Sequence, residues 1–203
     1  TGAISVQTGS SGVESSGSIG FTTGDSIQSA GSIKLRSGST AGASAASVTA
    51  VAGDSDSAAG GAVTLQAGQG QTTGGSVSIA GGFGKTQTGG AISMSSGTST
   101  QSHSGSVSIA TGTGGVNGQS GSVDISSGNG VSGVSGTLQI NSGAAAAGSS
   151  GDISLQAGTS AQSEGGSVIM RGGLSTTSTG GAISLIAGVA QAAESVGGSV
   201  SIK

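Results

Sequence analysis

The residues that could carry out chemistry are few and scattered in this sequence. The chain has one histidine, His103, no cysteine, and eight acidic residues with no repeated spacing. Zinc sites, disulfide scaffolds, c-type haem sites and thiol nucleophiles need Cys or His clusters, which are absent here. Glycoside hydrolysis needs two carboxylates that flank one bond, and the acids show no such pairing. We predict that the chain is not an enzyme, with no catalytic, cofactor-binding or metal-ligating residue and no cofactor.

Two glycine-rich segments share part of a nucleotide-binding motif. Residues 128–133 read GNGVSG and match the G-x-G-x-x-G fingerprint. That fingerprint also needs a helix, whereas another strand-like segment follows at Gly136. Near Lys85 the phosphate-loop pattern would need a glycine at position 79, which is Ile79. Because 45 glycines make a chance match expected, we predict no nucleotide site.

The composition excludes further classes of protein. Of 203 residues, 45 are Gly and 44 are Ser, and only 6% are charged, against roughly a quarter in an ordinary globular domain. A net charge of −3 cannot provide the basic surface that binds nucleic acid. No apolar run approaches the roughly 20 residues of a membrane span, and no signal peptide is visible. We therefore expect neither a nucleic-acid partner nor a membrane span.

A repeated pattern runs through the whole chain. Fourteen units follow the order Gly-x-apolar-x-apolar-x-x-Gly, spaced 14 to 17 residues apart. Their third and fifth positions make 28 sites, of which 27 carry Ile, Val, Leu, Met or Phe. A disordered Gly/Ser linker has no reason to show such a pattern. The units begin at Gly2, Gly17, Gly31, Ala46, Gly61, Gly75, Gly90, Gly105, Gly121, Gly136, Gly151, Gly166, Gly181 and Gly198.

The spacing within a unit predicts a short β-strand. Apolar residues two apart alternate as in a strand with one buried face, and nothing shows helical spacing. Strands that recur at a fixed period are typical of stacked repeat proteins. The sequence thus predicts an all-β fold: a parallel β-solenoid, or β-helix, of fourteen strand-turn units of about 15 residues. An alternation between G-A-I-S and G-S-V-S units favours two units per coil, and one unit per coil is the alternative.

This fold places particular residues inside and outside. Ile153 and Leu155 would pack against Val168 and Met170 in a narrow sandwich. The seventh position of each unit is always small, which predicts a crowded corner. The variable loop residues are expected on solvated edges; they include Glu14, Asp54, Asp56, Lys85, His103, Glu164 and Glu194.

Three large apolar residues share one loop position. For Phe83, Leu174 and Val189 the pattern leaves two placements open, under the corners or at the surface.

Hydroxyl side chains recur at the fourth position, between the two apolar sites. Nine of fourteen units carry Ser or Thr there, among them Ser5, Thr64 and Ser93. In a solenoid these residues would form flat hydroxyl rows, the kind of surface that ice-binding solenoids present. Ser dominates over Thr, and Lys34 and Asp124 interrupt the rows. A solvated sheet face is the other interpretation.

The units also resemble a known group of repeats. The order G-G-x-[IV]-S-[LIM], as in residues 89–94, resembles the Gly/Ser-rich short repeats of secreted surface and fibre proteins, notably of microalgae. It is similar as well to the repetitive stalks of microbial adhesins. The resemblance implies an extracellular or cell-surface location and a structural or adhesive role. Surface glycans are a further expected partner. No functional residue can be transferred.

The ends of the sequence carry a further expectation. The first unit begins in register at Gly2 and the last stops in mid-pattern at Lys203. We therefore expect residues 1–203 to form a single repetitive domain, uncapped at both ends, that associates end to end or continues in a longer array. The predicted function is a structural protein of an extracellular filament, cell-surface fibre or adhesive. The alternatives are an ice-binding solenoid and, further off, a carbohydrate-binding or carbohydrate-cleaving β-helix.

Overall fold

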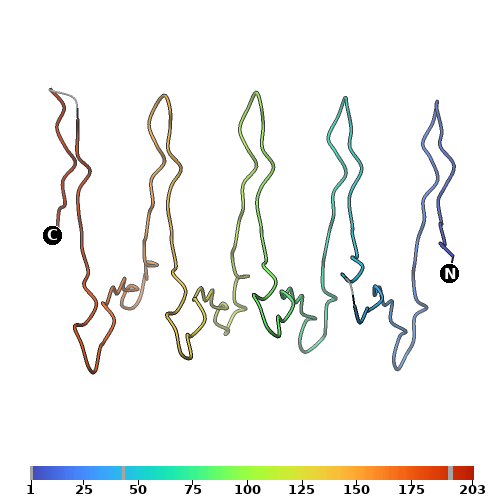
Figure 1. The fold of residues 1–203 in the computed structure, drawn as a ribbon, viewed down its shortest axis with the longest axis horizontal. Helices are drawn as coiled ribbons and strands as arrows, with labels where there is room; N and C mark the ends of the chain where they lie inside the picture. The colour runs from blue at the N-terminus through green and yellow to red at the C-terminus, as the bar shows by residue number, and fades with distance from the viewer. Residues whose placement is uncertain (1, 43, 192–193) are drawn as a thin grey trace. The chain divides into compact units, whose positions relative to one another are not determined.

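The structure is a computed structural model that describes residues 2–42, 44–191 and 194–203. Within these ranges no residue belongs to a helix or a strand. Figure 1 shows a chain that doubles back in successive loops, without coiled ribbons or arrows. The chain divides into two units, Thr1–Ser106 and Val107–Lys203. The boundary falls inside the repeat that begins at Gly105, where the composition does not change.

The predicted all-β fold is wrong. Neither a parallel β-solenoid nor any other β-helix of stacked coils is seen in the described ranges, because no segment there pairs as a strand. A solenoid needs backbone hydrogen bonds between equivalent segments of successive coils, whereas the backbone bonds found here close individual loops. The physical reason is that glycine loses the most conformational freedom in a strand and offers no side chain to pack. The alternation of apolar residues does not offset that cost when about half the chain is Gly or Ser.

The accessible surface shows how little the chain buries. It measures 19948 Å² for a mass of 18.3 kDa. A compact protein of this mass would expose about 8,100 Å², and a fully unfolded chain about 26,500 Å². The value therefore lies much closer to that of an unfolded chain. No residue in the described ranges is buried, whether apolar or polar.

Local order is concentrated where a loop begins and ends. The N–H of Gly61, the first residue of one repeat, donates to the carbonyl oxygen of Gly53 at 2.9 Å. Gly53 ends the apolar segment of the preceding repeat. The same bond, which we name the closing bond, is formed in seven loops of the described residues. Its donors and acceptors are Gly61–Gly53, Gly75–Gly68, Gly90–Gly82, Gly105–Gly97, Gly166–Gly158, Gly181–Gly173 and Gly198–Gly188.

The crowded corner predicted at the seventh position is confirmed in part of the repeats. A Cβ added to Gly61 would lie 3.2 Å from the Cβ of Ala52, the seventh residue of the preceding repeat. Gly17 meets Thr8 and Gly166 meets Ala157 in the same way, at 3.3 and 3.2 Å. In these repeats the first glycine of the next repeat folds back against the seventh side chain, which leaves room only for a small one, whereas a Cβ added to Gly151 would meet nothing within 4 Å. Six of the few partly buried residues occupy it: Ser37, Ala52, Ala67, Ser96, Ala157 and Ala187.

Where the structure explains why a residue is glycine, the reason is in most cases that neighbouring atoms lie close to the place of a Cβ, and not that the backbone has a positive φ. Among the described residues only Gly148 has a positive φ, of 102°. It lies in the loop 143–151, whose four alanines cannot supply a side-chain acceptor for the turn. A left-handed residue there requires glycine. At two corners close approach requires glycine, because a Cβ added to Gly90 or Gly181 would lie 2.8 or 2.9 Å from a backbone nitrogen of the preceding repeat.

Candidate functional site

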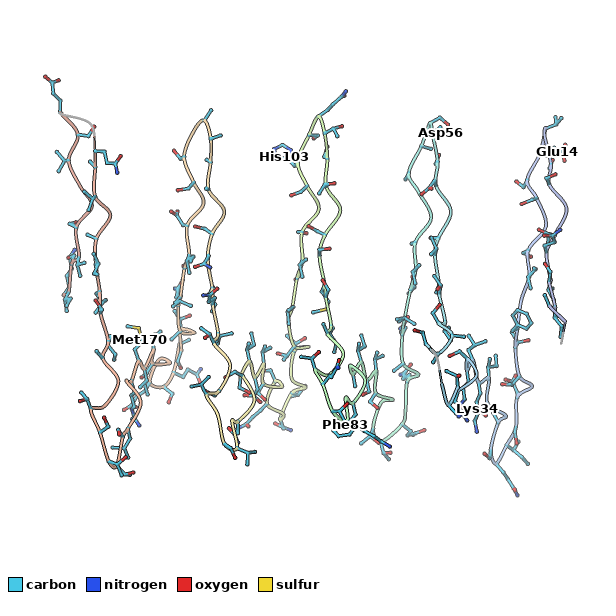
Figure 2. All side chains as sticks on the ribbon, in the orientation of Figure 1. Glu14, Lys34, Asp56, Phe83, His103 and Met170 are labelled. Carbon is cyan, nitrogen blue, oxygen red and sulfur yellow. The ribbon has the colours of Figure 1, made fainter. Side chains whose placement is uncertain are left out.

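The residues singled out for chemistry are dispersed over separate loops. His103, Glu14 and Asp56 lie at the ends of loops (Figure 2) and are exposed, as are the other variable loop residues. They are exposed to solvent as predicted, but the solenoid edges on which they were expected do not form in the described ranges. Within the described ranges, no group of three or more His, Cys, Asp or Glu residues is placed to hold a metal ion. The one side-chain pair in hydrogen-bond contact there, Ser122 Oγ to Asp124 Oδ2 at 3.4 Å, is exposed and lies within one repeat.

The glycine-rich segments form no ligand site of a known kind. Residues 128–133 lie in a loop, and the described residues after it contain no helix to complete a dinucleotide fingerprint. A shallow, open hollow is lined by Gln69, Gly70 and Gln71, three consecutive residues of one loop. It contains neither a charged group nor a nucleophile. The hollow therefore offers carboxamide and backbone groups only.

The feature that sets this chain apart is its exposed apolar side chains. All 39 Ile, Val, Leu, Met and Phe residues are exposed, from 47% for Ile19 to 104% for Ile27. We name the 27 of them at the third and fifth repeat positions the apolar array. The predicted sandwich of Ile153 and Leu155 against Val168 and Met170 does not form, since these four side chains are 51 to 69% exposed.

Exposure within the apolar array is graded by repeat position. From the second repeat onward the third-position side chains are 47 to 62% exposed, and the large fifth-position ones 60 to 88%. In each of these repeats with two large residues, the third position is the more covered. Apolar residues in the loops have almost no cover: Phe83, Leu174 and Val189 are 90, 92 and 87% exposed. Of the two placements left open for these three residues, the structure shows the surface one.

The hydroxyl rows predicted at the fourth position are not formed. A flat row needs paired strands that hold successive hydroxyls at one spacing, and the described part of the chain has none. The hydroxyls that do recur in contacts belong to the loops, a position that the repeat pattern did not single out. A signal was present in the sequence: the second residue after the glycine that ends a repeat's apolar segment is Ser or Thr in seven of thirteen loops.

Comparison with known proteins found no relative. The chain matches no family model, and no curated protein or solved structure resembles it. Among the described residues there is also no helix with the length and hydropathy to cross a membrane. The exposed apolar array is therefore the feature from which a function can be argued.

Proposed function

We propose that this protein is a structural component of an extracellular filament, cell-surface fibre or adhesive, and that it acts by associating with further copies of itself. The observation that carries the proposal is the exposed apolar array. Large apolar surface that is regularly spaced and left in water favours association with another surface. Completing the burial of a half-exposed Ile or Val side chain would contribute about 1 kcal/mol.

The rest of the composition supports an intermolecular role for this array. The chain is too poor in charge, at −3 overall and 6% charged residues, for electrostatic repulsion to keep copies apart. Its third-position side chains remain about half exposed from one repeat to the next, so each repeat offers a similar contact. A contact that joins different parts of two copies is heterologous, and it produces a filament where the rotation does not close. The extracellular location rests on the resemblance of the repeats alone.

The test is the association state of the 203-residue chain as a function of concentration. We expect light scattering to rise steeply above a threshold concentration and electron microscopy to show elongated particles. Stable monomers at high concentration, without any tendency to elongate, would refute the proposal. Thermal hysteresis measured on the same samples separates the ice-binding alternative, because activity at micromolar protein without association would favour that function instead.

A further inference from the structure

One position in the loops divides them into three groups. This is the tenth residue of a repeat, two positions after the glycine that ends the repeat's apolar segment. It is Ser or Thr in seven loops, Gly in four and Ala in two. The Ser/Thr loops carry Ser11, Ser26, Thr40, Ser55, Ser99, Ser160 and Ser175, the Gly loops Gly70, Gly84, Gly114 and Gly130, and the Ala loops Ala145 and Ala190.

In the Ser/Thr loops the hydroxyl oxygen accepts a backbone N–H from within the same loop. The N–H of Ala58 donates to Ser55 Oγ at 3.0 Å, and that of Ser178 to Ser175 Oγ at 2.9 Å. All seven Ser/Thr loops show such a bond, with the N–H two or three residues onward. Every hydrogen bond from backbone to side chain in the described ranges is of this kind. Other loop serines, such as Ser57, accept none there.

In the Gly loops a carbonyl oxygen occupies the space that a side chain would need. A Cβ added to Gly84 would lie 2.6 Å from the oxygens of both Gln87 and Thr88. At Gly70 the oxygen of Thr73, three residues onward, would overlap the added Cβ. Gly114 and Gly130 meet carbonyl oxygens of Gly118 and Gly133 in the same way. Real Cβ atoms essentially never approach so closely, so none of these loops can carry Ser without changing its backbone.

We propose that the tenth residue is a conformational selector. Ser or Thr locks the loop with an N–H turned inward onto the hydroxyl, a turn in which the side chain replaces a backbone acceptor. Glycine selects a second loop conformation in which a carbonyl oxygen turns inward onto its α-carbon. The Ala loop 143–151 supports the assignment: it has neither a hydroxyl nor a glycine at this position, and it contains the residue with positive φ, Gly148. The selector acts within one chain and does not depend on self-association.

The experiment substitutes each of the two residue types by the other in the full chain and includes a matched control. Ser55→Gly should speed amide hydrogen exchange at Ala58 by roughly two- to tenfold, the net effect of one hydrogen bond. Ser55→Thr should preserve the slow exchange, because Thr retains the acceptor. Ser57→Gly adds a glycine to the same loop without removing the acceptor, so exchange at Ala58 should stay unchanged relative to its intrinsic rate.

The reverse substitution tests whether the tenth residue determines the loop conformation or is only compatible with it. Gly70→Ser should force the loop out of its present conformation and slow exchange at Thr73, three residues onward, by a similar factor. NMR measurements on dilute samples, below any association threshold, give these rates residue by residue. Equal effects of Ser55→Gly and Ser57→Gly at Ala58, or unchanged exchange at Thr73 in Gly70→Ser, would overturn the proposal.

Discussion

Loop corners and apolar segments behave in opposite ways in this molecule. At the corners, small residues such as Ala52 and Ala157 are partly buried and backbone groups are hydrogen-bonded. In the segments between them, large side chains such as Leu35 and Leu65 remain 84 and 77% exposed. Small seventh-position residues are therefore better covered than the large apolar residues. Local interactions over about eight residues are sufficient to close a corner, whereas burying a large apolar side chain needs a partner from elsewhere.

The comparison shows which part of the repeat is self-sufficient. The seven corners that form the closing bond share glycine at both closing positions and a small seventh residue, and four of them also carry a hydroxyl at the tenth. The ordering cost of such a short loop is low because its ends are close in sequence. The apolar segments lack that advantage, since their equivalents lie about 15 residues away. We infer that corners form in the isolated chain and that apolar segments are buried only on association.

The largest expected effect comes from charging the apolar array. Replacing Ile153 and Ile183 together by Asp would place carboxylates where a partner must make an apolar contact, which is costly when they become buried. We expect the concentration threshold for association to rise by about tenfold or more. Light scattering over a dilution series measures this threshold directly.

The matched control adds the same charge one residue further on. Ser154→Asp with Ser184→Asp introduces two carboxylates at fourth positions in the same repeats, and we expect a change of less than about threefold. Equal shifts in both double variants would mean that net charge, rather than the apolar array, controls association. The closing bonds should be unaffected in either variant.

A smaller effect is expected when a corner is filled. Gly90→Ala would place a Cβ 2.8 Å from the backbone nitrogen of Gly82, so the closing bond between these residues, now 2.9 Å, must break. Exchange of the residue-90 amide should accelerate by roughly two- to tenfold relative to its intrinsic rate. Gly82→Ala is the control in the same loop, because a Cβ there has nothing within 4 Å. Closure retained in Gly90→Ala would show that the corner can relax, contrary to our account.

Sequence reasoning succeeded at the corners and failed in the segments, for related physical reasons. The small size of the seventh residue and the solvent exposure of Glu14 and His103 could be predicted, because steric size and charge act locally and are evident from the repeated sequence pattern. The pairing of segments such as that at Ile153 depends on a balance between apolar burial and the entropy of ordering glycine. Alternation shows where apolar residues lie along the chain, but it does not determine whether their backbones find partners. The solenoid prediction is wrong because periodicity alone does not imply pairing.

The missed feature was the loop hydroxyl. Serine is so frequent, at 44 residues, that Ser55 or Ser175 does not stand out from its neighbours in composition. Only its constant distance from the preceding glycine distinguishes it, together with the replacement by glycine in four other loops. A Ser/Thr-or-Gly alternative at one position is typical of turns. Comparison of this one position across all thirteen loops, in addition to the apolar segments, would have predicted it.

The smallest expected effect is that of salt on association. The chain has only five basic and eight acidic residues, spread over loops and segments, so charges contribute little to any contact between apolar arrays. Exposed charges are screened over about 10 Å at 0.1 M salt. Raising sodium chloride from about 0.05 to about 0.5 M should therefore move the association threshold by less than about threefold. A strong inhibition of association by salt would instead identify ion pairs as the driving contacts and would place the interface in the charged loops.

A small decrease in the association threshold is the result expected of apolar burial. The Ile153 and Ile183 double variant should respond to salt more than the unaltered chain does, because screening relieves the repulsion between its added carboxylates.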